Sequence, residues 1–269
     1  MPANKATKFR RTVSRCDRSG LFPGYHPSMI PDLNLIHGSA TNRRRDLTLP
    51  AGFISPCLPM MAPRPPSGPS WLHEIKYDGV RVVARKVGGR VRLYDRLGAD
   101  VTQRFPLIVD ALAPLPSCTI DGEAVAGDDG RVPSFDLPQR QRDDRAVLCA
   151  FDLIELSGDD RRREPLAQRK ADLSRLLAAA SPGLVLCKWI DGDKCEGAVA
   201  FEQVCAMGLE GMVSKRKDSR YISGRSPYWL KMTNPGSDAA RRRAQEESVR
   251  RTLPSVESPS TTALPDSHD

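Results

Sequence analysis

Between residues 53 and 235 short apolar stretches alternate with turn-forming residues, which predicts strands joined largely by tight turns. The clearest hairpin has strands at 80–87 and 90–94, joined by Gly88 and Gly89. We expect Lys76 to follow a strand as well. Further strands are predicted at 119–126, with a partner after Asp129-Gly130, and at 147–153, 212–215 and 228–232.

Three segments have the period of a helix instead. Residues 103–112 follow Thr102, which we expect to cap a helix that holds Pro106 in its first turn. Residues 166–180 and 196–207 place their apolar side chains on one helical face, and Gly208 ends the second helix. Hairpins with interspersed helices predict an α+β fold built of antiparallel sheets with flanking helices.

The two ends of the chain differ in composition from this central part. Residues 1–50 lack a sustained period and hold nine Lys/Arg against three Asp, a net charge of +6 out of +8 for the chain. A mostly disordered basic arm of this kind attracts nucleic acid, although a solvated tail without a partner has the same composition. We therefore divide the chain into an arm (1–50), one folded domain (51–235) and a segment (236–269) with a short helix, capped by Asp238, and a disordered tail.

Several classes of protein are excluded by composition. No apolar run approaches the ~20 residues that span a bilayer, and the N-terminus has no apolar stretch of a secretory signal, so we expect a cytoplasmic protein. The seven cysteines lack C-x-x-C spacing, which argues against a zinc site or a disulfide framework. Neither the P-loop motif nor the Rossmann glycine motif occurs, so nucleotide binding through either of these motifs is unsupported.

Six short segments carry residues that suit nucleotide chemistry. They are Glu74-Ile75-Lys76-Tyr77-Asp78-Gly79-Val80-Arg81, Asp95-Arg96-Leu97-Gly98, Asp121-Gly122-Glu123, Ala150-Phe151-Asp152-Leu153, Glu210-Gly211-Met212-Val213-Ser214-Lys215 and Trp229-Leu230-Lys231-Met232. Lys76 lies at a strand end. A lysine amine attacks only when it is neutral, and neighbouring cations such as Arg81, Lys215 and Lys231 favour that form.

The remaining segments add a metal site and a base contact. Glu123 and Glu210 are carboxylates suited to a divalent cation, and Phe151 suits stacking on a base. Each residue has a plainer explanation, since an isolated Lys-x-Asp-Gly is usually an exposed turn and a buried phenylalanine usually packs in a core. Their order and spacing together indicate transfer of a nucleotide through a covalent lysyl intermediate.

From about residue 53 to 235 the sequence resembles the covalent nucleotidyltransferases, and specifically the adenylation domain of bacterial ATP-dependent DNA ligases of the end-joining type. The likeness includes the long stretches 71–81, 207–216 and 219–231. It implies an ATP-grasp-like fold, the use of ATP with Mg²⁺ or Mn²⁺, and sealing of nicked double-stranded DNA through lysyl-AMP. It also implies a monomer with a possible repair or end-joining partner.

The resemblance implies a role for each candidate residue. Lys76 would attack the α-phosphate of ATP and release diphosphate. Glu74 would contact adenine, and Phe151 would stack on it. Arg81 would contact the ribose and phosphate, and Glu123 would bind the ribose and, together with Glu210, the metal. Lys215 and Lys231 would contact the α-phosphate, and Arg96 would bind the nicked strand near its 5′-phosphate.

Two features depart from the family pattern. Thr233 stands where the terminal W-x-K-x-K strand has its second lysine, and the 34 residues after Pro235 are fewer than the roughly 70–100 that an OB-fold barrel needs. Two alternatives therefore stay open. One is an RNA ligase or a GTP-using capping-type enzyme, which shares the lysine motif, and the other is a non-catalytic ligase fragment that binds nucleic acid.

Overall fold

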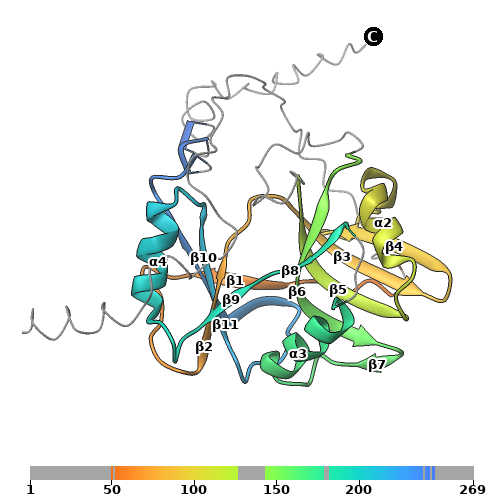
Figure 1. The fold of residues 1–269 in the computed structure, drawn as a ribbon, viewed down its shortest axis with the longest axis horizontal. Coiled ribbons are helices and arrows are strands. Elements are labelled where there is room, and N and C mark those ends of the chain that lie inside the picture. The colour runs from red at the N-terminus through yellow and green to blue at the C-terminus, as the bar shows by residue number, and fades with distance from the viewer. Residues whose placement is uncertain are drawn as a thin grey trace, which may run out of the picture.

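Two β-sheets lie side by side, with helices toward the outside of the molecule (Figure 1). The structure is a computed structural model that describes residues 50, 52–126, 143–178, 182–238, 240–242 and 244–245. Sheet A has the order β1 (Cys57–Met61), β11 (Gly224–Thr233), β10 (Gly211–Arg216), β2 (Trp71–Ile75) and β9 (Trp189–Asp191). Sheet B has the order β4 (Arg90–Asp95), β3 (Val80–Val87), β5 (Cys118–Val125), β6 (Val147–Leu156) and β7 (Asp159–Asp160), and β8 (Leu184–Leu186) also pairs with β6.

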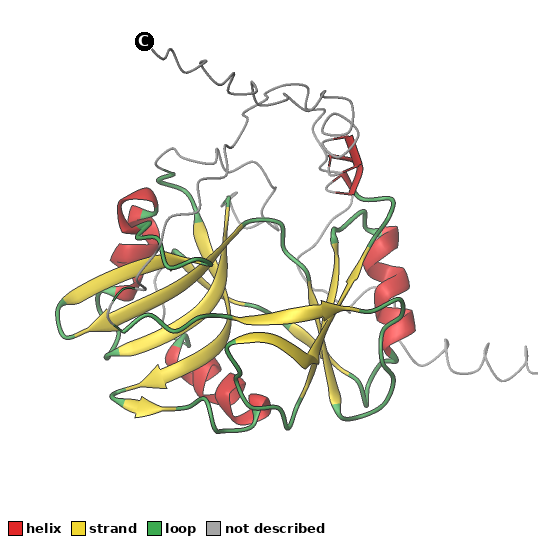
Figure 2. Ribbon diagram, turned by 180° about the vertical axis from the view of Figure 1, so that it is seen from behind, coloured by secondary structure: helices red, strands yellow, loops and turns green. Residues whose placement is uncertain are grey.

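Most of the strand pairs are antiparallel. The exceptions among the paired strands are β1 with β11 and β6 with β8, which are parallel. The helices are α2 (Pro106–Leu112), α3 (Leu166–Leu176) and α4 (Gly197–Ala206), with a short 3₁₀ turn, η1 (Thr102–Arg104), before α2. Figure 2 shows these helices at the periphery of the sheets. The predicted α+β fold of antiparallel sheets with flanking helices is confirmed.

Apolar side chains fill three layers. One cluster lies between sheet B and helices α2 and α3, and the layer between sheet A and α4 consists of two clusters. The third joins the two sheets, because it contains Leu72 and Trp229 from sheet A together with Val83 and Phe151 from sheet B. Burial of apolar side chains on both sides of this layer holds the two sheets against each other.

Gly79 marks the point where the chain passes from sheet A to sheet B. A Cβ atom there would lie 2.3 Å from the carbonyl oxygen of Ala124 on β5, so a larger residue would push the segment away. The absence of a side chain lets the turn after Lys76 pass directly against β5. Lys76 is thereby held at the junction of the two sheets.

One predicted helix is divided in two. Residues 103–112 form η1 and then α2, separated by Phe105 at φ −126° and ψ 68°. The proline ring of Pro106 disfavours helical geometry for the preceding residue, so the helix begins only after Phe105. The predicted cap, Thr102, has another role, because its hydroxyl accepts a hydrogen bond from the Leu93 amide at 3.0 Å.

The helix predicted after Pro235 begins one residue earlier than expected. The Ser237 hydroxyl accepts a hydrogen bond from the Ala240 amide at 3.2 Å, so Ser237 and not Asp238 caps it. Asp238 instead forms an ion pair with Arg241. The strand expected after Gly130, the tail after residue 245 and the arm 1–49 lie outside the described residues, so the domain boundaries remain predictions.

The other boundaries follow the prediction closely. The hairpin about Gly88 and Gly89 is formed by β3 and β4, and the helix predicted at 196–207 is α4. The helix predicted at 166–180 ends at Leu176. Within the part of the chain that the structure describes, no helix is long and apolar enough to cross a membrane.

Candidate active site

The strands of sheet A place several candidate residues on one face. Val213 on β10 pairs with Glu74 on one side and with Lys231 on the other, so these two side chains lie in one row across the sheet. The Lys76 amide donates a 2.9 Å hydrogen bond to the Gly211 carbonyl, and Gly211 pairs with Thr233. Residues two apart in a strand point to the same face, so Lys76 and Thr233 occupy the neighbouring row.

Lys76 is flanked by carboxylates. Its amine forms an ion pair with Glu210, which precedes β10 and is 2% exposed, whereas the Lys76 side chain is 20% exposed. Glu123 on β5 lies near enough that Lys76, Glu210 and Arg81 all influence its titration. Burial raises the pKa of Glu123 to about 7 although Arg81 and Lys76 oppose this, and Glu210 adds to the increase.

Glu123 and Glu210 fit the needs of a magnesium or manganese ion. Mg²⁺ keeps several waters and binds proteins through one or two carboxylates together with substrate phosphates. Among the residues that the structure describes, no group of three or more His, Cys, Asp or Glu could hold a metal by itself. A two-carboxylate site of this kind suits a cation that arrives with a nucleotide.

Glu74 is a buried carboxylate with two lysine partners. Lys170 on α3 lies 2.5 Å from its Oε1 atom and Lys215 on β10 lies 2.8 Å from its Oε2 atom. Burial alone would raise the pKa of Glu74, but the two lysines outweigh it and lower the pKa below its usual range. Glu74 is therefore charged at neutral pH.

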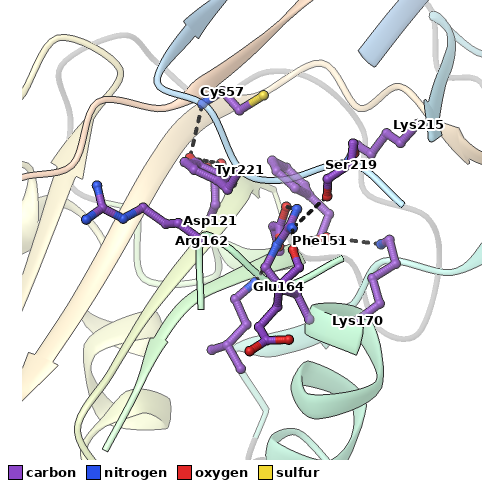
Figure 3. Close-up of polar contacts among 12 residues, drawn as sticks. Cys57, Asp121, Phe151, Arg162, Glu164, Lys170, Lys215, Ser219 and Tyr221 are labelled. Atoms are coloured by element: carbon purple, nitrogen blue, oxygen red, sulfur yellow. Dashed lines mark hydrogen bonds and ion pairs between the residues drawn. The ribbon is translucent and has the colours of Figure 1, made fainter. Parts of the chain in front are cut away.

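Arg81 is held by a second buried network. Its guanidinium donates to both oxygens of Asp121 at 2.6 and 2.7 Å. The Tyr221 hydroxyl also donates to Asp121, at 2.6 Å (Figure 3). The same hydroxyl accepts a 3.1 Å hydrogen bond from the Cys57 amide. Burial alone would lower the pKa of Arg81, but Asp121 outweighs it and raises the pKa, so the guanidinium stays charged.

Phe151 lies between the two sheets. The pairing of β5 with β6 passes from Gly122–Ala150 to Asp121–Asp152, so Phe151 is the extra residue of a β-bulge. Its ring centroid is 4.5 Å from the Arg81 guanidinium carbon and 4.1 Å from Lys215 Nζ, and the residue is 7% exposed. Stacking of a base on this ring therefore requires a neighbouring side chain to move.

Arg96 directly follows Asp95, which pairs with Val82, the neighbour of Arg81 on β3. It follows β4 in a loop whose shape is held by Asp95, because the Asp95 carboxylate accepts hydrogen bonds from the amides of Leu97 and Ala99. Arg96 and Leu97 are exposed there. The structure thus brings together Glu74, Lys76, Arg81, Glu123, Phe151, Glu210, Lys215 and Lys231 around the sheet junction. Arg96 lies in an exposed loop that begins at the Arg81 end of the β3–β4 pair.

Three residues of the site were missed from the sequence. Asp121 has a signal, because it lies two residues before Glu123 in one strand and so shares its face. Lys170 also has one, because it follows Leu166 by four residues on the apolar face of α3. Tyr221 lies in a loop, and its contact with Asp121 has no local sequence signal.

Comparison with known proteins decides the family. Residues 62–233 match the family described as ATP dependent DNA ligase domain. The chain belongs to this family. The predicted resemblance is confirmed, and an adenylation-type ligase domain agrees with the lysine, carboxylates and antiparallel sheets described above.

Three relatives illustrate the extent of the match. The SPbeta prophage-derived DNA ligase-like protein LigB of Bacillus subtilis (strain 168) is 30% identical over 188 residues, which are 68% of each chain. The multifunctional non-homologous end joining protein LigD of Pseudomonas aeruginosa is 34% identical over 186 residues, which are 67% of this chain and 22% of that protein. The ligase domain of M. tuberculosis LigD matches in structure with a TM-score of 0.58 and 34% identity, over 66% of this chain and 59% of that one.

Proposed function

We propose that this chain seals nicks in duplex DNA by using ATP and forming a covalent lysyl-AMP intermediate. The observation that carries the proposal is the position of Lys76, which directly follows β2 at the sheet junction, beside Glu210 and within the electrostatic reach of Glu123. Membership of the ATP dependent DNA ligase domain family supports the use of ATP and the choice of DNA. The long LigD relatives contain much more chain than this match covers, so the activity stands as a proposal for this protein.

In the first step the amine of Lys76 attacks the α-phosphorus of ATP. A nitrogen–phosphorus bond forms, the bond to the β-phosphate oxygen breaks, and diphosphate leaves. The amine must lose its protons on the way, and the adjacent carboxylate of Glu210 is placed to accept one. Lys215 and Lys231, on the same face of sheet A, supply positive charge for the phosphate in the transition state.

A divalent cation held by Glu123 and Glu210 would neutralise charge on the triphosphate and engage the carboxylate that now pairs with Lys76. We propose Mg²⁺ or Mn²⁺ for this role, on the strength of the two-carboxylate donor set. Glu74 contacts adenine, Phe151 stacks on it, and Arg81, fixed by Asp121, contacts the ribose and phosphate.

Two further transfers complete the reaction. The 5′-phosphate of the nick attacks the lysyl-AMP phosphorus, which releases Lys76 and gives DNA-adenylate. The 3′-hydroxyl then attacks the adenylylated 5′-phosphate, so that a phosphodiester bond forms and AMP leaves. Arg96, exposed beside β4, suits a contact with the nicked strand near its 5′-phosphate, since arginine binds phosphate with two parallel hydrogen bonds.

The setting follows from this chemistry. We propose a monomer that acts in the cytoplasm on DNA of the nucleoid, in DNA repair and recombination, with a repair or end-joining protein as a possible partner. An RNA ligase, a GTP-using capping-type enzyme and a non-catalytic fragment remain the alternatives, although the carboxylates placed around Lys76 favour catalysis over the last of these.

Labelling separates these possibilities. The purified chain is incubated with Mn²⁺ and α-labelled ATP or GTP, and the protein is examined for acid-stable label. Sealing is then followed on nicked DNA and nicked RNA duplexes. We expect covalent label from ATP and sealing of DNA. Preference for RNA would point to an RNA ligase, label from GTP to a capping-type enzyme, and no label at all to a non-catalytic fragment.

A further inference from the structure

The buried carboxylate of Glu74 contacts two lysines, although one positive charge would balance it. The side chains of Glu74, Lys170 and Lys215 are each at most 3% exposed, and both lysines contact the one carboxylate. Asp152, another acid near Lys215, is already bound by Arg169 at 2.7 and 2.8 Å. This cluster of one anion and two cations is costly to bury unless a further anion joins it.

The two lysines are held to different degrees. Lys170 Nζ donates to the Phe151 carbonyl at 3.0 Å (Figure 3). It also contacts Glu74 and lies 4.7 Å from the centroid of the Trp189 ring. Besides Glu74, Lys215 Nζ contacts the ring of Phe151 and also that of Trp229, at 4.0 Å from its centroid. An aromatic ring is a weaker partner than a phosphate, so an arriving phosphate attracts Lys215 more readily than Lys170.

We propose that Lys170 is a positioning residue, which holds Glu74 as the acceptor for the 6-amino group of adenine and lets Lys215 leave for the α-phosphate. This inference rests on the proposed function. When Lys215 turns to the phosphate, Lys170 stays on Oε1 of Glu74, so the buried carboxylate keeps a counter-ion. Oε2, which Lys215 has left, then accepts from the 6-amino group.

The same arrangement selects the base. Guanine carries a carbonyl oxygen at position 6, which would face the Glu74 carboxylate and be repelled. Without Lys170, Lys215 is the remaining cation beside Glu74, so the carboxylate and the phosphate compete for one lysine. If Lys215 stays with Glu74, the phosphate lacks its cation. If Lys215 moves to the phosphate, the buried carboxylate has no counter-ion. Loss of Lys170 should therefore weaken both ATP binding and the preference for adenine.

The decisive measurement compares two nucleotides in equilibrium binding. The full chain carrying Lys76→Ala, which prevents the covalent step, is titrated with ATP and with purine riboside triphosphate, which lacks the 6-amino group. We expect a preference for ATP of roughly 10- to 100-fold, the range for a hydrogen bond to a charged group. Lys170→Met should reduce this preference to less than about threefold, and Lys170→Arg should restore most of it because the cation remains.

Stability provides the control. Lys170→Met leaves Glu74 paired with Lys215 in the nucleotide-free protein, so its thermal midpoint should stay within about 4 °C of the parent. Weakening of both nucleotides by one common factor, or no change in either, would show that Lys170 only supports the fold. A parent that binds both nucleotides equally would also overturn the inference. The proposed function is tested separately, by covalent labelling of the parent protein, in which Lys76 is intact, with α-labelled ATP.

Discussion

The amine of Lys76 and the carboxylate of Glu210 form an ion pair although the two residues are far apart in the sequence. The pair exists because β2 and β10 are antiparallel neighbours, so the end of one strand meets the start of the other. A lysine in such a pair is charged, and nucleophilic attack requires the neutral amine. Glu210 therefore holds Lys76 in place. Before the attack, Glu210 must either accept a proton from the Lys76 amine or give up its ion pair with that amine.

This relationship leads to a first prediction about the nucleophile. Lys76→Ala should abolish covalent labelling by α-labelled ATP. Lys76→Arg should abolish it equally, because a guanidinium stays protonated and cannot attack, even though it retains the charge beside Glu210. Circular dichroism confirms that both variants fold. Acid-stable label in either variant would place the nucleophile elsewhere.

A second prediction concerns the row of sheet A that contains Lys76 and Thr233. Thr233 pairs with Gly211, whose carbonyl accepts the Lys76 amide, so a lysine at 233 would extend over the same face toward the phosphate. An added cation near a transferring phosphate contributes about 1 kcal/mol, or roughly fivefold in rate. Thr233→Lys should raise the rate of labelling by that factor.

Thr233→Met is the matched control, because it adds length to the side chain without charge. It should leave the labelling rate near that of the parent protein, measured in single turnover with ATP in excess. Equal rates for the Lys and Met variants would mean that position 233 does not act on the phosphate.

A third prediction follows from His73, which is fully buried beside Ser214. The two side chains share a 2.8 Å hydrogen bond, and burial lowers the pKa of His73 from 6.5 to about 4. The unfolded chain takes up this proton near pH 6.5, and the folded chain takes it up only near pH 4. Stability should therefore fall as the pH is lowered from about 6.5 to 4, by at most roughly 3 kcal/mol.

Urea unfolding at several pH values measures this effect. His73→Gln should flatten the decline between pH 6.5 and 4, whatever its effect on stability at pH 7.5. His268→Gln makes the same chemical change outside the predicted folded domain and should leave the decline as it is. A decline that persists unchanged in His73→Gln would assign it to other groups.

The elements that local pattern predicts are those whose structure depends on neighbours in sequence. The hairpin of β3 and β4 has its glycine turn, and α4 has its apolar face and a terminating glycine. The strands β1, β8 and β9 have three to five residues each and form by pairing with distant segments. No hydrophobic period within these segments predicts a strand.

The site divides in the same way. Residue types and spacing identify Lys76 as the nucleophile candidate and Glu123 and Glu210 as a carboxylate pair, because each lies in a short recognisable segment. The contacts between Glu74 and its two lysines join segments about 100 and about 140 residues apart, so they depend on how α3 and β10 pack on β2. The family resemblance assigns Lys215 to the phosphate, and in the structure this lysine pairs with Glu74.

A fourth prediction concerns the basic arm, residues 1–50, most of which lies outside the described residues. Its nine lysines and arginines carry most of the net charge, and cations that bind DNA phosphates release counter-ions. Deleting residues 2–50 should leave labelling by ATP nearly unchanged, because Lys76 and its partners lie in the sheets. The same deletion should weaken DNA binding and flatten its dependence on salt.

The slope of log affinity against log salt concentration should change by about 0.9 for each DNA phosphate that the arm no longer neutralises. The matched control keeps residues 2–50 but replaces their lysines and arginines with glutamine, which removes the charge without shortening the chain. Both proteins should show the same reduction in slope if charge is the cause. An unchanged slope in both would mean that the arm does not touch DNA. A slope that is reduced only in the deletion variant would mean that the arm binds DNA through interactions other than charge.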